Sequence, residues 1–304
     1  MGSFAFTTQS VNVNYRGHFP NTLGKGDFVL DAAGKGPSFI TNYFGLGNEV
    51  PDTEEDLEFH RVRGTNISLH PAFYKDLNGG HSIQFGPTYE FYNLEQTEDR
   101  FVNTPEAALT SNTFDSRHYV GLDATYDYSI VDNPLLPLRG FRFLFGAEHR
   151  LNVNDTDFNF SRLHSDLAVY IPLNVQKSVL VATKLGAAFN FGDYEFFQAN
   201  QLGGSSQVRG LNTGKFAGDG TFYHATDLRI ALGRSKSVSF PFTFGVHGSF
   251  DYGRAWLEGE DSDQWHTSIG GGAYFIPLNL FVFRVSYFAS DDDTILSIGA
   301  NFSF

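Results

Sequence analysis

The feature that most constrains this sequence is an alternation of apolar and polar residues over long segments. In segment 83–91 the odd-numbered positions are Ile, Phe, Pro, Tyr and Phe, and the even-numbered positions are Gln, Gly, Thr and Glu. A period of two places the two sets on opposite faces of a β-strand. Such segments recur between clusters of Gly, Asn, Asp and Pro, and none is typical of an amphipathic helix. The predicted strands are 3–17, 27–44, 58–75, 80–95, 117–132, 138–153, 158–174, 177–192, 222–235, 240–257, 265–277, 279–290 and 294–304.

The lengths of the strands and loops favour a membrane barrel over a soluble β-sandwich, in which strands also alternate. One face of nearly every segment is rich in the 33 Phe and 14 Tyr residues, and the other carries Gly and charged groups. Several segments exceed the roughly nine to eleven residues of a tilted membrane strand, whereas soluble strands average about five or six. Tight turns alternate with long polar loops, namely 45–58, 95–116, 193–221 and 257–264. We therefore predict an all-β, antiparallel transmembrane β-barrel, in which the thirteen recognised strands belong to a barrel of 14–16 strands.

Composition excludes several classes of protein and site. No run reaches the roughly 18 to 20 apolar residues that a membrane-spanning helix needs, so a helical membrane protein is excluded. A net charge of −13 argues against nucleic acid as a partner, because nucleic acid requires a basic surface. The chain has no Cys, and its His residues lack ligand spacing. We expect neither a metal site nor a cofactor.

Four motifs in the C-terminal third carry a family resemblance. They are Leu202-Gly-Gly-Ser-Ser-Gln-Val-Arg-Gly-Leu211, Gly218-Asp-Gly220, Asp227-Leu-Arg229 and Phe250-Asp-Tyr-Gly-Arg-Ala-Trp256. In this order they resemble the C-terminal barrel of the BamA/TamA (surface-antigen) superfamily of outer-membrane assembly and translocation proteins. Four ordered motifs are a more specific signal than one glycine-rich stretch.

The resemblance implies a role for each motif residue. Val208, Arg209 and Gly210 correspond to the tip of a long loop, here 193–221, that folds back into the barrel lumen. Its arginine meets the aspartate of a Phe-x-Asp-x-Gly motif, which corresponds to Asp251 and ends at Gly253. The resemblance also implies that two aromatic residues form a C-terminal signal for barrel insertion, namely Phe302 and Phe304.

The alternation in strand 240–257 agrees with this assignment independently. Its apolar phase leaves Asp251 facing inward, where a carboxylate needs a partner that Arg209 can supply. Asp227 and Arg229 share the inward phase of their own strand and are placed to extend the network. The alternative is that Arg209 points into solvent from an ordinary loop.

Three features depart from the family pattern. The superfamily usually places periplasmic POTRA modules before sixteen strands, whereas residues 1–44 already alternate like strands. The predicted number of strands is odd, which places Ser3 on the outer surface, whereas bacterial barrels usually have an even number. A truncated start, or one strand wrongly split, would explain the odd number. Segment 41–49 also resembles barrels that follow phosphoesterase or patatin-like domains, but no Gly-x-Ser-x-Gly elbow or Asp/His metal constellation is visible.

The sequence predicts one outer-membrane β-barrel domain, residues 1–304, that acts in membrane-protein assembly or translocation. We expect membrane lipid, the outer-membrane assembly machinery and periplasmic or surface lipoproteins as partners, and no nucleic acid. The alternative is a passive pore, or a membrane anchor for a partner or fused enzyme domain. An enzyme is not expected, because no nucleophile and base stand at a recognisable spacing.

Overall fold

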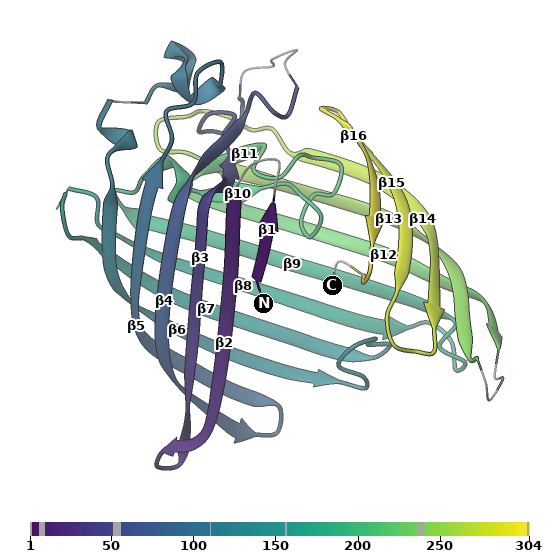
Figure 1. Cartoon of the computed structure of the whole chain (residues 1–304). Coiled ribbons are helices and arrows are strands. Elements are labelled where there is room, and N and C mark those ends of the chain that lie inside the picture. The colour runs from purple at the N-terminus through teal and green to yellow at the C-terminus, as the bar shows by residue number, and fades with distance from the viewer. Residues whose placement is uncertain are drawn as a thin grey trace.

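The computed structural model describes residues 2–5, 10–50, 56–109, 111–155, 157–235, 237, 240–302 and 304. Its 14-stranded antiparallel sheet curves around a central lumen (Figure 1). Each strand pairs with the next, except that β9 pairs with β12 because β10 and β11 form a separate hairpin. In order, the sheet contains β1 (Gly2–Ala5), β2 (Ser10–Leu23), β3 (Gly26–Asn42), β4 (Arg61–Asn78), β5 (His81–Leu94), β6 (Arg117–Val131), β7 (Gly140–Asn152), β8 (Phe160–Pro172), β9 (Val179–Gly192), β12 (Gly220–Ser235), β13 (Phe242–Trp256), β14 (His266–Pro277), β15 (Phe283–Ser290) and β16 (Thr294–Gly299).

The first predicted strand, 3–17, is wrong, because it contains both β1 and β2. The two strands pair with Gly2 opposite Val13 and Ala5 opposite Ser10. Residues 5–10 contain no Gly, Asn, Asp or Pro, so no turn residue marks the break. The resulting even number of strands places the start of β1 and the end of β16 at the same end of the barrel, which corrects the odd count.

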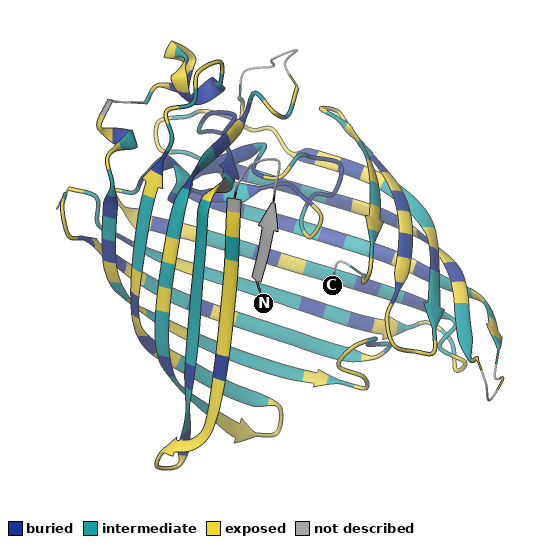
Figure 2. Ribbon diagram, viewed as in Figure 1, coloured by how far each residue is buried: buried dark blue, intermediate teal, exposed yellow. Residues whose placement is uncertain are grey.

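The two faces of the sheet differ as the alternation predicts. Along β13, Phe244, Val246 and Phe250 point outward and are exposed, whereas Ser249 and Asp251 are buried on the lumen side. Figure 2 shows this alternation of exposed and buried residues along the strands. The apolar outer face is what a barrel needs for contact with hydrocarbon.

The connections at the two ends of the barrel differ in length. At the turn end, β4 and β5 are joined by a two-residue hairpin in which Gly79 and Gly80 have φ of 63° and 86°, as a type I′ turn requires. At the loop end, long segments that include four 3-10 helices pack together (Figure 1). These helices are η1 (Phe101–Asn103), η2 (Pro105–Ala107), η3 (Ser111–Phe114) and η4 (Phe196–Gln198). Among the described residues, no helix is long and apolar enough to cross a membrane.

A buried cluster joins several connections at the loop end. Tyr43, Phe101 and Phe196 come from three different connections and pack with one another, with ring centroids 5.6 Å apart for Tyr43 and Phe101 and 4.4 Å apart for Tyr43 and Phe196. At the same end, Arg117 donates to Glu195 at 2.8 Å, with both side chains buried. Burial raises the pKa of the Glu195 carboxyl, and the Arg117 guanidinium opposes that rise. The connections at this end are therefore held together by packed side chains and a buried ion pair.

The first and last strands of the sheet, β1 and β16, are its shortest. Within the described ranges no pairing joins β1 to β16, so the sheet order is linear from one to the other. β1 has 4 residues and β16 has 6, whereas β4 has 18. The backbone hydrogen bonds available at the seam between these two strands are therefore few.

Candidate functional site: the loop and its lumenal ion-pair network

The segment between β9 and β12 folds into the barrel instead of lying over its rim (Figure 1). Two short strands begin and end its inner part, β10 (Asn200–Leu202) and β11 (Phe216–Gly218), which pair antiparallel. Three side chains from the segment, Leu202, Val208 and Leu211, are fully buried and pack against Tyr223 and Ala255 on the inner faces of β12 and β13. The glycines at 203 and 204 have φ of 112° and 93°, so the chain can turn sharply enough to enter.

Arg209, at the tip of this loop, makes a two-pronged contact with Asp251 of β13. Its Nε lies 2.8 Å from Asp251 Oδ2, and its Nη2 lies 2.6 Å from Oδ1. The backbone N–H of Arg209 also donates to Oδ2 at 3.1 Å. Arg209 is 2% exposed and Asp251 is 0% exposed. This geometry is the strong, bidentate form of an arginine–carboxylate pair.

A second pair on β12 joins the first. Arg209 Nη1 donates to Asp227 Oδ1 at 2.7 Å, and Arg229 donates to Asp227 Oδ2 from Nε at 3.1 Å and from Nη2 at 2.9 Å. Ser249 Oγ donates to the same carboxylate at 2.7 Å. Two guanidinium groups thus face two buried carboxylates, here called the lumenal network: Arg209, Asp227, Arg229 and Asp251. Buried charges are stable only when they are matched and hydrogen bonded in this way.

Two glycines allow the loop to approach the wall. A Cβ added at Gly253 would lie 2.7 Å from Leu202 Cδ1 and 3.0 Å from Val208 Cγ2, so a side chain there would push the loop away. A Cβ at Gly210 would overlap Ser268 Oγ, and the Gly210 carbonyl accepts a hydrogen bond from Ser290 Oγ at 2.9 Å. The predicted site glycines therefore lie where the loop and the strands approach each other closely.

The end of the chain contacts the same network. The predicted strand 294–304 is too long, because β16 ends at Gly299, and Phe302 and Phe304 beyond it contact Arg229 of the lumenal network. The Phe302 ring centroid lies 3.8 Å from Arg229 Cζ, and that of Phe304 lies 5.4 Å from it. The Phe304 carbonyl accepts a hydrogen bond from Arg229 Nη2 at 3.0 Å. These contacts with guanidinium groups replace pairing with a neighbouring strand, and they are the physical reason for the shorter β16.

Sequence reasoning missed two residues of this region. Phe288 of β15 is buried, with its ring centroid 4.8 Å from Arg209 Cζ. Asn48, from the β3–β4 loop, is fully buried at the loop end, where its side chain donates to Ser262 Oγ at 2.9 Å and accepts from the Ala255 N–H at 2.9 Å. The inward phase of β15 could have indicated Phe288, whereas Asn48 lies outside any periodic segment.

Other charged side chains form ion pairs separate from this network. Arg150 donates to Glu90 at 2.9 Å and also pairs with Asp123. Lys184 lies 3.4 Å from Asp166. The described residues contain no group of three or more His, Cys, Asp or Glu side chains arranged to hold a metal ion.

Comparisons with known proteins agree with this architecture. A family profile described as the Omp85 superfamily domain matches residues 6–293. BamA from Haemophilus ducreyi lacking POTRA domains 1-3 has a TM-score of 0.68 and 14% identity, over 96% of this chain and 61% of that one. CdiB from Escherichia coli has a TM-score of 0.57 and 12% identity, over 96% and 51%. No curated protein sequence gave a significant match.

The two structural likenesses show the fold, and this chain spans 61% and 51% of those proteins. The predicted barrel architecture and the predicted superfamily are confirmed. Because the profile covers nearly the whole sequence, the chain belongs to the Omp85 superfamily.

Proposed function

We propose that this chain is a bacterial outer-membrane barrel that assembles or translocates other proteins, and that its Val-Arg-Gly loop is fixed inside the lumen by the lumenal network. Membership of the Omp85 superfamily supports the general role. The observation that carries the proposal is the bidentate contact between Arg209 and Asp251, with distances of 2.8 and 2.6 Å.

The seam supports a route for client proteins. Since β1 and β16 are short and no pairing joins them to each other in the described ranges, opening between them would break few hydrogen bonds. An unpaired strand edge presents N–H and C=O groups that can pair with an incoming strand. We infer that a client strand enters between β1 and β16 while the loop keeps the rest of the wall rigid.

The test is an assembly assay with the purified chain in lipid vesicles. An unfolded outer-membrane barrel client is added, and its folding is followed by heat-modifiable migration on a gel. We expect faster client folding than in empty vesicles, and a slower rate with Arg209→Ala. Equal rates in empty and protein-containing vesicles would contradict the assembly function.

The second candidate is a passive pore or anchor. It is favoured by a cavity of about 570 Å³ in the lumen, lined by charged and amide side chains that include Glu148, Arg162 and Gln198. A stable open conductance in planar bilayers, together with no effect on client folding, would support the pore. A mostly closed state would agree with a loop held inside the lumen and with the first proposal.

A further inference from the structure

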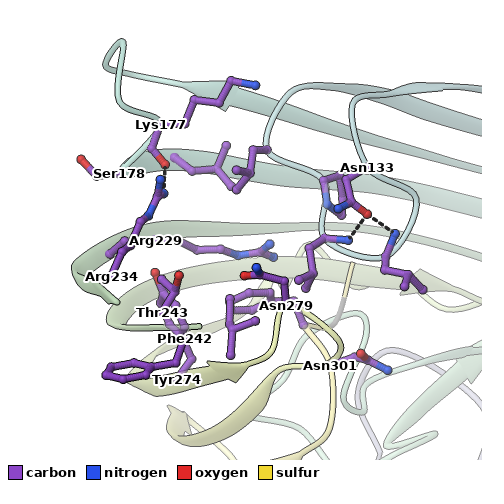
Figure 3. A pocket seen from close by; sticks show the side chains of 18 of the residues that line it. Asn133, Lys177, Ser178, Arg229, Arg234, Phe242, Thr243, Tyr274, Asn279 and Asn301 are labelled. Atoms are coloured by element: carbon purple, nitrogen blue, oxygen red, sulfur yellow. Dashed lines mark hydrogen bonds between the residues drawn. The ribbon is translucent and has the colours of Figure 1, made fainter. Parts of the chain in front are cut away.

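A cavity of about 780 Å³ lies at the turn end of the barrel, lined by residues of the β6–β7, β8–β9, β12–β13 and β14–β15 connections, of the adjoining strands and of the end of the chain. Figure 3 shows side chains from several of these segments around one space, among them Arg229, Tyr274 and Asn279. The cavity shares no lining residue with the charged cavity in the lumen described above. Its volume is within the range of pockets that enclose a small-molecule ligand.

The strands that form this cavity turn apolar side chains toward the lumen. Leu180 of β9, Ala231 of β12 and Ile276 of β14 line it, and all three occupy the inward phase of their strands. Farther toward the loop end, the inward positions of β9 and β12 carry charged residues, Lys184 and Asp227. The interior of a membrane barrel is normally polar. An apolar wall favours an apolar occupant, because removal of apolar surface from water is favourable.

The β6–β7 connection adds a second apolar wall. Leu135, Leu136 and Leu138 all line the cavity. Asn133 Oδ1 accepts hydrogen bonds from the N–H groups of Leu135 and Leu136 at 2.9 and 3.1 Å, as the dashed lines in Figure 3 show. Leu138 also packs against the buried cluster that contains Leu180. The connection is therefore folded so that its leucines face the same space as the strand residues.

The cavity is cationic, although the chain carries a net charge of −13. Among the described residues no side chain that lines it is a carboxylate, and four cations do line it: Arg142, Lys177, Arg229 and Arg234. Three of the four have an acidic neighbour. Arg229 pairs with Asp227, Lys177 lies 2.7 Å from Asp132, and Asp127 acts electrostatically on Arg142. The fourth cation, Arg234, differs from them.

Arg234 is the cation that is available to a ligand. Its side chain is exposed and donates to the carbonyls of Gln176 and Lys177 at 3.2 and 2.8 Å. Within the described part of the chain these two carbonyls are its hydrogen-bond partners, and no carboxylate forms an ion pair with it. A carbonyl oxygen carries no formal charge, so the guanidinium charge is not neutralised. A cleft with one sign of charge concentrates ligands of the opposite sign.

The charged and apolar parts of the cavity follow one another along β12. Arg234 is the second-last residue of this strand, and Arg229 lies five residues deeper. Because a strand rises about 3.3 Å per residue, roughly 16 Å separates the two along the strand, with Ala231 between them. At the inner end, the Phe302 ring centroid lies 3.8 Å from Arg229 Cζ. The cavity therefore has a charged rim, an apolar middle and an aromatic inner end.

We propose that the turn-end cavity binds a single-chain anionic amphiphile, namely an acyl chain that ends in a carboxylate or a phosphate. The chain packs against Leu180, Ala231 and Ile276, and the head group pairs with Arg234 at the rim. This binding site goes beyond the proposed function and does not depend on it.

A single-chain ligand fits this place better than a phospholipid from the surrounding bilayer. The strand residues of the wall point inward, so the cavity opens to the lumen and not to the hydrocarbon around the barrel. A two-chain lipid would have to withdraw both chains from the bilayer, and every CH₂ withdrawn costs free energy. A single-chain amphiphile dissolves in water as a monomer and can reach the turn end from the aqueous side.

The experiment uses a dodecanoate with a photoreactive diazirine near its methyl end, and the full chain in a neutral detergent. After illumination, the labelled peptides are identified by mass spectrometry. We expect saturable labelling of peptides that contain Leu180, Ala231 or Ile276. Unlabelled dodecanoate and dodecyl phosphate should compete with it. Dodecanol has the same chain without the charge, and it should compete at least about threefold less well.

Two pairs of variants test the rim and the apolar middle. Arg234→Gln should weaken labelling about threefold or more, whereas Lys25→Gln in the β2–β3 turn should not, because Lys25 does not line the cavity. Ala231→Trp should abolish labelling by filling the cavity. Leu232→Trp should leave it unchanged, because Leu232 is 61% exposed and does not line the cavity. Heat-modifiable migration checks that each variant is folded.

A second measurement follows the temperature at which the fast-migrating folded form is lost. A ligand that binds only the folded form stabilises it, so dodecanoate below its micelle concentration should raise this temperature. The rise should be the same in Lys25→Gln and smaller in Arg234→Gln. It needs no photolabel, and it therefore checks the role of Arg234 independently.

Three outcomes would overturn the proposal. The first is labelling that is confined to outward-facing peptides or that dodecanoate does not reduce. The second is an equal loss of labelling in Arg234→Gln and Lys25→Gln. The third is competition by inorganic phosphate or by dihexanoyl phosphatidylglycerol without competition by dodecanoate, which would indicate a site for a free anion or for a two-chain lipid.

Discussion

At the scale of single residues, the lumenal network is a set of charges that are stable only together. Arg209 bridges Asp227 and Asp251, and all three side chains are almost completely shielded from water. Removing one partner of a buried pair leaves the other charge uncompensated, which costs much more than the pair itself contributes. Moving the loop out of the lumen would therefore remove the Arg209 charge that the two buried carboxylates need.

We expect Arg209→Ala to destabilise the barrel by about 3–5 kcal/mol, because it leaves two buried carboxylates facing a single remaining guanidinium. The measurement is the temperature at which the fast-migrating folded form is lost on a gel. Asp251→Ala should cost less in the Arg209→Ala background than alone, since the two residues are in contact. Arg16→Ala is the control, because that side chain is 65% exposed and its Asp31 partner is 3.6 Å away. Equal effects of Arg209→Ala and Arg16→Ala would contradict the network.

Gly253→Ala should disturb the loop, whereas Gly248→Ala on the same strand should not. A Cβ at Gly253 meets Leu202, Val208 and the Phe222 carbonyl within 3.0 Å, and a Cβ at Gly248 meets nothing within 4 Å. Overpacking typically costs about 1–3 kcal/mol. Limited proteolysis of the loop compares the two variants, and similar cleavage rates would argue against the close approach.

At the scale of elements, alternation predicts most of the sheet because strands that bury one face must keep the period of two. Alternation does not show where one strand ends and the next begins when no turn residue lies between them. The sequence therefore predicts one strand where the structure has β1 and β2. Alternation also cannot show where an apolar strand end leaves the sheet. Phe302 and Phe304 continue the alternation of β16, yet they bind the guanidinium of Arg229. That outcome depends on a residue distant in sequence.

The candidate site was accessible to sequence reasoning only in part. The inward phase of β12 and β13 places Asp227 and Asp251 in the lumen, and the motif resemblance connects them with Arg209. No pattern indicates that Arg209 would reach both carboxylates, because that depends on how the loop packs. The roles of these residues as a lock, and of the C-terminal aromatics as an insertion signal, stay predictions.

Replacing both C-terminal aromatics by leucine tests how the end of the chain is held. The double variant Phe302→Leu/Phe304→Leu keeps apolar volume but removes the ring faces on Arg229, each of which contributes about 0.5–2 kcal/mol. We expect faster trimming of the C-terminus by carboxypeptidase and a lower midpoint of thermal unfolding. Trimming at the rate of the unaltered protein would show that ring–cation contacts do not hold this segment.

At the scale of the whole molecule, the effect of an exposed apolar residue on stability depends on whether water or a lipid bilayer surrounds the protein. Phe250 is 50% exposed on the outer face near the middle of β13. On a soluble protein, replacing such an exposed residue usually changes the free energy of unfolding by less than about 0.5 kcal/mol. In a bilayer, Arg at the midplane of a barrel costs about 2–4 kcal/mol.

We therefore expect Phe250→Arg to destabilise the vesicle-embedded barrel by about 2–4 kcal/mol, measured by denaturant unfolding monitored by Trp fluorescence. Val175→Arg is the control, because Val175 is 95% exposed in the β8–β9 turn, outside the strands. It should have little effect. Equal small effects of both substitutions would show that the aromatic face does not contact hydrocarbon.

The central claim is that Arg209 holds the loop inside a lipid-embedded barrel. Cross-linking tests it most directly, because the chain has no Cys and a pair can be introduced without background. Asn212 on the loop donates to Asp293 beyond β15 at 2.6 Å, so Asn212→Cys/Asp293→Cys places two thiols within reach of a short bifunctional reagent. We expect efficient cross-linking with Arg209 present and with Arg16→Ala, and a clear loss with Arg209→Ala. Equal yields in all three backgrounds, or no cross-link in any, would contradict the account.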